Sequence, residues 1–232
     1  IGDNHYYADI VNGNVTFNIY KLDAGKYNFT VTYEGDDTYL TNQSNSSFIV
    51  SKHQPEFAVN GTDIIFGDDE LIKFETVSNI TAVVKVEIGG ENYTAFISEG
   101  KGNLTVYKLV PGDYNITLYF EGNEKYLNAS AKNNFTVSKA TPEIAISVVN
   151  ITYTENETVV VYVDATGDVT LTIAETGYVG TVDLVDGKAT FIVKGLNAGN
   201  YTVEATFNGN KEFNATSATA NFTVFKADPI IT

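Results

Sequence analysis

The sequence contains no cysteine, no methionine and no tryptophan, and its 14 basic residues are all lysines. Without cysteine the chain can form no disulfide, no zinc-thiolate site and no thiol nucleophile. Its domains must therefore be held together by core packing alone. Hydrophobic residues make up 43% of the 232 positions, which is enough to build such cores.

Positive charge is also scarce, because the 14 lysines face 29 acidic residues and leave a net charge of −15. That charge repels phosphate backbones and anionic lipids, so we expect no nucleic-acid partner. No apolar run approaches the roughly 20 residues that span a bilayer, and the first residues show no signal-peptide pattern. We expect no membrane contact in this segment. We also expect Ile1 to fall inside a structural unit, with any targeting or anchoring segment elsewhere.

Helical periodicity is missing as well, and a two-residue alternation takes its place. Within residues 22–35 the apolar side chains from Tyr27 to Tyr33 fall on alternate positions, and polar residues mostly fill the gaps. This period is typical of a strand with one buried face. Because the pattern returns at residues 109–122 and 196–209, we predict an all-β protein with essentially no helix.

An internal repeat organises the chain, since Gly25, Gly112 and Gly199 are each 87 positions apart. The same offset aligns other glycine, aromatic, valine, lysine and proline positions without any insertion. We therefore predict serial β-sandwich repeats of 87 residues, with about seven strands each. The predicted domains are residues 1–52 as a partial repeat with strands D to G only, 53–139 and 140–226 as complete repeats, and 227–232 as the start of a following repeat.

The third repeat shows the seven strands most fully, separated by turns such as Asp186-Gly187 whose residues tolerate positive φ. Short alternating runs of this kind, divided by turn residues, are typical of an antiparallel sandwich. The predicted strands are residues 143–149, 158–165, 169–174, 179–184, 189–193, 200–207 and 218–224.

The turn before the main strand of each repeat reads Leu-x-x-Gly-x-Tyr. Glycine allows the chain to swing sharply, and the tyrosine can bury its ring while its hydroxyl bonds nearby backbone. This turn resembles the tyrosine corner at the start of strand F in immunoglobulin-like sandwiches, which implies that fold for every repeat. The fold-defining corner residues are Gly25, Tyr27, Gly112, Tyr114, Gly199 and Tyr201.

Two further motifs make the resemblance more specific. One is Gly-Asp/Asn-x-x-Tyr/Phe, best seen in the segment from Tyr33 to Tyr39, and the other is Phe-x-Val-x-Lys at the end of each repeat. With the corner, they resemble the bacterial and archaeal Ig-like repeats of large cell-surface proteins, which are frequent in archaeal adhesin-like proteins. The resemblance covers both complete repeats and the partial one, and it implies an extracellular, cell-surface location. The third copy has Asn210 where the first has Asp36, which argues against a conserved use of the acid.

The segments between repeats, Ser51 to Glu56 and Ser138 to Glu143, are short and contain proline but no glycine. Such joints are restricted rather than floppy. Successive domains are therefore expected to form an extended, semi-rigid rod, with about 40 Å contributed by each domain.

Asn-x-Ser/Thr acceptor sequences are dense, at 16 of the 24 asparagines, where chance would give roughly 4. They predict N-glycosylation, and thus covalent glycans as partners of the chain. Strand alternation also generates the pattern when the outward face is rich in Asn and Thr, so both interpretations stay open. Sites near turns, such as Asn42, Asn128 and Asn214, are the best candidates. The candidate sites are Asn14, Asn28, Asn42, Asn45, Asn60, Asn79, Asn92, Asn103, Asn115, Asn128, Asn134, Asn150, Asn156, Asn200, Asn214 and Asn221.

Acidic turns raise the question of calcium. One cluster is Glu34, Asp36 and Asp37, and the other is Asp68, Asp69 and Glu70. Calcium needs about 6 to 8 converging oxygens, and neither cluster has a known loop spacing, so ordinary solvated turns are favoured. His5 and His53 do not recur between repeats and lack a second ligand at a suitable spacing. We expect no metal, no cofactor and no catalytic residue, and hence no enzyme.

The sequence thus predicts a non-enzymatic structural spacer or stalk region of a cell-surface adhesin-like protein, with the neighbouring repeats of the array as partners. A second hypothesis is a subunit of an extracellular filament or surface lattice, completed by β-strand addition from other copies of the chain. A third is a glycan-binding module, for which exposed tyrosines such as Tyr20 and Tyr107 would stack on sugars.

Overall fold

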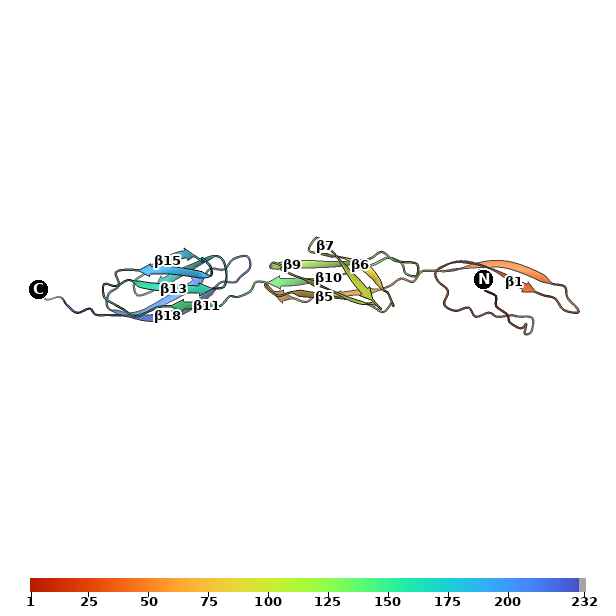
Figure 1. Ribbon diagram of the computed structural model, residues 1–232, viewed down its shortest axis with the longest axis horizontal. Helices are drawn as coiled ribbons and strands as arrows, with labels where there is room; N and C mark the ends of the chain where they lie inside the picture. Colours follow the sequence, from red (N-terminus) through yellow and green to blue (C-terminus); the bar gives the residue numbers. More distant parts are fainter. Residues whose placement is uncertain (230–232) are drawn as a thin grey trace. The chain divides into compact units, whose positions relative to one another are not determined.

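The computed structural model describes residues 1–229. In that range all the regular secondary structure is β-strand (Figure 1). The strands are β1 (Gly25–Tyr33), β2 (Asn42–Val50), β3 (Phe57–Asn60), β4 (Ile64–Ile65), β5 (Glu70–Thr76), β6 (Ala82–Ile88), β7 (Glu91–Ser98), β8 (Lys101–Val106), β9 (Gly112–Phe120), β10 (Ala129–Ser138), β11 (Ile144–Ser147), β12 (Ile151–Thr152), β13 (Glu157–Val163), β14 (Asp168–Ile173), β15 (Tyr178–Asp183), β16 (Lys188–Val193), β17 (Gly199–Phe207) and β18 (Thr216–Phe225). Over the described residues no helix is long and apolar enough to cross a bilayer.

The third repeat folds into two sheets, one with the strand order β11-β13-β16 and one with the order β12-β18-β17-β14-β15. Alternate residues of these strands point inward, and Val161, Leu171 and Val203 are completely buried. The inward residues of both sheets form one hydrophobic cluster, which Phe207 and Phe222 join. Two sheets packed over a shared core make an immunoglobulin-like β-sandwich.

The equivalent strands of the second repeat follow the same order but form one continuous sheet, β3-β5-β8-β7-β6-β9-β10-β4. The difference lies at a single edge, where Ile97 pairs with Gly102 and Ser98 pairs with Lys101, so that β7 joins β8. Their counterparts in the third repeat, β15 and β16, belong to separate sheets. The second repeat is thus the same sandwich with its two halves connected along one side.

These strands confirm the predicted all-β, immunoglobulin-like fold of both complete repeats. The seven segments predicted in the third repeat correspond to β11 and to β13 through β18. The prediction missed β12, whose two residues pair in parallel with β18 through Ile151 and Val224. In the second repeat β4 pairs with β10 in the same way. A two-residue strand is too short to show any alternation, so the sequence pattern does not reveal it.

Residues 1–52 contain only two strands, β1 and β2, which pair in antiparallel register from Gly25 opposite Val50 to Tyr33 opposite Asn42. The expected strands D and E are not formed. Residues 4–19, which correspond to β7 and β8, show only an isolated bridge between Val11 and Asn14. In the second repeat β7 lies against β6, and β8 lies between β5 and β7. Residues 1–24 supply no counterpart of β5 or β6, and an isolated hairpin is marginally stable in water.

Residue contacts divide the chain into two compact units that do not coincide with the repeats. The first consists of residues 1–61, 72–104 and 115–133, and the second of residues 62–71, 105–114 and 134–232. The predicted repeat boundaries therefore stay a prediction. Residues 227–229 form no strand, and the rest of the expected fourth repeat lies outside the described residues.

Candidate functional site

The tyrosine corner is built in the same way in all three repeats. The hydroxyl of Tyr27 donates a hydrogen bond of 2.9 Å to the carbonyl oxygen of Asp23, four residues upstream. Tyr114 donates to Val110 over 2.9 Å, and Tyr201 donates to Asn197 over 2.8 Å. Each bond ties the turn to the start of the strand that follows it.

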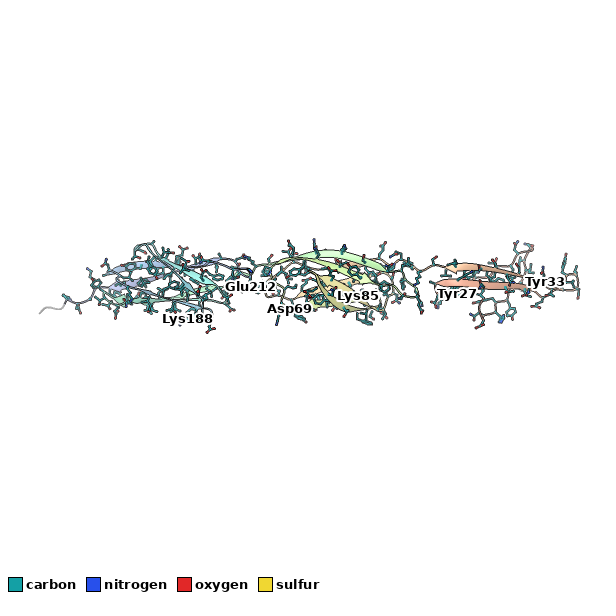
Figure 2. The ribbon with its side chains drawn as sticks, turned by 90° about the horizontal axis from the view of Figure 1, so that it is seen from above. Tyr27, Tyr33, Asp69, Lys85, Lys188 and Glu212 are labelled. Carbon is teal, nitrogen blue, oxygen red and sulfur yellow. The ribbon has the colours of Figure 1, made fainter. Side chains whose placement is uncertain are left out.

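Each corner tyrosine also stacks on a phenylalanine of the neighbouring strand. The ring centroids are 5.4 Å apart for Tyr27 and Phe48, 5.2 Å for Tyr114 and Phe135, and 5.4 Å for Tyr201 and Phe222. The tyrosine therefore fastens its strand to the next one on the core side while its hydroxyl holds the turn. Figure 2 shows Tyr27 on β1, near one end of the first hairpin.

The corner glycine has a different backbone conformation in the second repeat from that in the other two. Gly112 has φ of 158°, whereas Gly25 and Gly199 do not have positive φ. The nearest atom to an added Cβ on Gly25 or Gly199 is a tyrosine ring carbon about 4 Å away. The left-handed residue lies four positions earlier, at Lys21, Lys108 and Gly195, with φ of 59°, 57° and 71°. All three repeats therefore turn through a left-handed residue at this earlier position, where only the third repeat carries a glycine, which adopts that conformation without strain.

The loop between the last two strands of each repeat is closed by one side chain. Asp36 accepts hydrogen bonds of 2.7 Å from the backbone amides of Thr38 and Tyr39 through one carboxylate oxygen. Asn123 and Asn210, at the same place in the later repeats, accept the equivalent pairs of bonds through their amide oxygens. This is an Asx turn, which needs one side-chain oxygen and no charge. It explains why the first repeat can have Asp at this position and the later two repeats Asn.

A glycine precedes the Asx residue each time, and here the glycine is required. Gly35, Gly122 and Gly209 have φ of 90°, 86° and 77°. A Cβ on any of them would lie within 2.9 Å of a backbone atom of the same loop, just before the next strand begins, as close as 2.8 Å to the amide nitrogen of Ala215 for Gly209. Neither the backbone nor the conformation can accommodate a side chain.

Two of the acids considered for calcium, Asp36 and Glu70, accept hydrogen bonds within the protein. The Tyr33 hydroxyl donates to the second carboxylate oxygen of Asp36 over 2.5 Å (Figure 2 labels Tyr33). This bond and the two amide bonds lower the pKa of Asp36, and the same contact raises the pKa of Tyr33. Over residues 1–229 no three acidic or histidine side chains gather at metal-binding distances. In the second cluster Glu70 is buried, so the interpretation of that cluster as a solvated turn is wrong for this residue.

Glu70 and its counterpart Glu157 are buried, which the sequence analysis did not predict for either residue. Both are 0% exposed, and they are the first residues of β5 and β13. Glu70 accepts hydrogen bonds from the backbone amide and the hydroxyl of Thr62, at 2.8 and 3.1 Å. Glu157 accepts one bond of 2.9 Å from the amide of Val149. The signal was available, because the two glutamates are 87 positions apart and each precedes an alternating apolar run.

The linker between repeats is tied to the loop of the repeat that follows it. The amide of His53 donates to Lys125 over 3.0 Å, and the His53 carbonyl accepts from Leu127 over 2.9 Å. Ala140 makes the equivalent bonds with Glu212 and Asn214, at 3.1 and 2.7 Å. The residue two positions before each linker proline is thus held by a short parallel bridge.

All 16 candidate glycosylation asparagines are exposed. Their side chains differ in how free they are. Both hydrogens of the Asn214 amide are used, by the carbonyl of Lys139 at 3.3 Å and the hydroxyl of Thr141 at 3.1 Å. The side-chain amides of Asn28, Asn115 and Asn128 make no hydrogen bond with another group of the described chain. Among the turn sites, Asn128 is accordingly a more open acceptor than Asn214.

The remaining candidate residues lie on the surface. Tyr20 and Tyr107 are 79% and 64% exposed. His5 is exposed, and the ring of His53 lies edge-on against Tyr126 with centroids 6.0 Å apart. On the outer face of the second repeat, Lys85 and Glu121 form an ion pair of 2.5 Å, which lowers the pKa of the Glu121 carboxyl (Figure 2 labels Lys85).

No protein-family model matches the chain, and no curated protein matches it. Among solved structures it is similar to the fibronectin(III)-like modules of CbhA from Clostridium thermocellum, with 14% identity over 74% of this chain and 95% of that chain and a TM-score of 0.31. A 1.5-MDa bacterial ice-binding adhesin is 12% identical over 87% of this chain and 74% of that one, with a TM-score of 0.36. Titin domains I67–I69 are 15% identical over 74% and 66%, with a TM-score of 0.33. We therefore base the fold assignment on the strand order and the tyrosine corner, and not on these weak similarities.

Proposed function

We propose that the chain is a non-enzymatic structural spacer, a stalk region of a cell-surface adhesin-like protein. The observation that supports this most directly is the repeated anchoring of the linker, through His53 in one joint and Ala140 in the next. A chain that only had to connect domains would not need a backbone bridge at each junction. A spacer does, because its length is useful only if the joints resist bending.

Side chains reinforce the second joint. Within the second compact unit, the rings of Phe66 and Phe213 meet edge-on with centroids 5.4 Å apart. The Lys139 ammonium donates to the carbonyl oxygen of Asn210 over 2.6 Å. Aromatic pairs of this kind contribute about 0.5–1.5 kcal/mol beyond their buried area. In this proposal, these contacts and the Ala140 bridge restrain the chain where it enters the third repeat.

The proposal predicts an extended particle in solution. Three units of about 40 Å end to end give a radius of gyration of about 35 Å, whereas a compact globule of this length would have about 17 Å. Small-angle X-ray scattering on the full chain measures this quantity directly. The matched control is a variant with the four residues Gly-Ser-Gly-Ser inserted between Lys139 and Ala140. Its pair-distance distribution should broaden, and its average pair distance should fall. A value near that of the globule, or an insertion without effect, would contradict the spacer.

Surface location and glycosylation belong to the same proposal. The exposed acceptor asparagines and the net charge of −15 would keep a long stalk soluble and separate from its neighbours. The full chain produced in a host that attaches N-linked sugars should carry glycan at Asn128 and none at Asn214, which glycopeptide mass spectrometry can measure. Occupancy confined to Asn214, or an unmodified chain, would count against this part of the proposal. The filament and glycan-binding hypotheses stay predictions.

A further inference from the structure

Glu70 and Glu157 occupy the same position in two successive sandwiches, but the groups around their carboxylates differ. In the second repeat both carboxylate oxygens are satisfied, one by the Thr62 amide and one by the Thr62 hydroxyl. In the third repeat Val149 replaces the threonine, so only the amide remains. The second oxygen of Glu157 is buried and has no hydrogen-bond partner.

The Glu157 carboxylate is bonded to the segment in which the chain crosses from one sheet of the sandwich to the other. β11 belongs to the sheet of β13 and β16, and β12 belongs to the sheet of β18 and β17. Val149 lies in the short segment between β11 and β12, so the bond from its amide to Glu157 fastens this crossover to the start of β13. Loss of that bond would leave the crossover held only by the strands at its two ends.

We propose that Glu157 is a proton-dependent latch on this crossover, which makes the third repeat more stable in mildly acidic than in neutral solution. A buried carboxyl with one unpaired oxygen costs less free energy when it is protonated than when it is ionised, because an ionised carboxylate needs hydrogen bonds on both oxygens. The second repeat supplies both bonds and the third does not. The two repeats therefore differ in their response to pH although their folds are the same.

The surroundings of Glu157 contain no charge that would change this conclusion. β16 places Val193 opposite Glu157, and β12 begins with the apolar Ile151. The titratable residues that directly follow these strands, Tyr153, Glu155 and Lys194, are exposed, and Glu155 accepts a bond from the Thr152 amide. Burial raises the pKa of Glu157, partly opposed by the Val149 amide, and no neighbouring charge contributes. The folded state thus binds the proton more tightly than the unfolded chain, so the stabilisation is complete below the ordinary glutamate value of 4.5 and is lost as pH rises through the raised pKa.

Hydrogen exchange with mass spectrometry on the full chain, corrected for the intrinsic pH dependence of exchange, tests the latch. Protection of β11 and β13 should fall severalfold between pH 5 and pH 8, and protection of β3 and β5 should fall less. Val149→Thr supplies the missing hydroxyl without changing net charge, and it should remove most of the difference. Because Val149 is exposed and the second repeat already has threonine there, this variant should fold.

The reciprocal variant transfers the property. Thr62→Val leaves one oxygen of Glu70 without its hydroxyl partner, so β3 and β5 should acquire the pH response of the third repeat. Glu157→Gln should abolish the response of the third repeat, because the amide does not titrate. An unchanged pH response in Val149→Thr, or no gain in Thr62→Val, would show that the difference comes from the net charge of the chain and not from this carboxyl.

Discussion

Replacement of Gly209 by alanine is expected to lower the free energy of unfolding of the third repeat by about 2–4 kcal/mol. The residue has φ of 77°, where a Cβ costs about 1–2 kcal/mol. The added methyl would also lie 2.8 Å from the amide nitrogen of Ala215 and 3.1 Å from the carbonyl oxygen of Phe213. Both are backbone atoms of the closed loop, so the loop itself must open to accommodate the methyl.

A matched control separates the two causes. Gly177 has φ of 69°, but an added Cβ there meets no atom within 4 Å. Gly177→Ala should therefore cost only about 1–2 kcal/mol, from the backbone conformation alone. Hydrogen exchange of β17 and β18 peptides in the full chain measures both losses, with β9 as an internal reference. Equal losses in the two variants would show that the loop does not constrain Gly209.

The same variant should loosen the joint. The Asx turn of Asn210 follows Gly209 directly, and the loop that it closes holds the linker through Ala140. If the loop opens, the amide of Ala140 loses its acceptor on Glu212. Faster exchange of the Ala140 amide in Gly209→Ala than in Gly177→Ala would connect this glycine to the stiffness on which the spacer depends.

Most of the fold could be predicted from the sequence because the alternating strand pattern, which is weak evidence in one copy, occurs in three aligned copies. A single alternating strand such as residues 200–207 is ambiguous, but three aligned copies point to the same strand and the same corner. The prediction failed where a residue's role depends on its environment. Glu70 looks like part of a solvated acidic turn beside Asp68 and Asp69, yet it is completely buried. Only the three-dimensional course of the chain shows that the backbone of Thr62 comes back to meet it.

The hydrogen bonds of Asp36 could be predicted only in part from the sequence. Three acids within four positions suggest a cation, but the carboxylate of Asp36 is occupied by two backbone amides and a tyrosine hydroxyl. The substitution by Asn123 and Asn210 in the later repeats was the clue, since an amide oxygen can accept the backbone bonds but brings no charge. The side-chain oxygen at this position closes the turn in all three repeats, and the turn forms with or without the charge.

Replacement of Tyr201 by alanine is the second large effect, with an expected loss of about 3–5 kcal/mol from the third repeat. The ring is 8% exposed and stacks on Phe222 with an interplanar angle of 19°. Its removal leaves a cavity beside β18 and also breaks the bond to Asn197. Urea titration followed by hydrogen exchange of β17 and β18 in the full chain gives the loss for this repeat separately.

Two further variants divide that loss between ring and hydroxyl. Tyr201→Phe removes only the 2.8 Å hydrogen bond, and because Asn197 is exposed, water can replace the hydroxyl at its carbonyl oxygen. The cost should therefore be about 0.5–1.5 kcal/mol. Tyr27→Ala tests the ring in the first repeat, where the same bond and the same stack exist but the ring is only half-buried, so the loss should be smaller than for Tyr201→Ala. If Tyr201→Phe cost as much as Tyr201→Ala, the corner would act through its hydrogen bond alone. The stacked ring would then not be what joins the last two strands of each repeat.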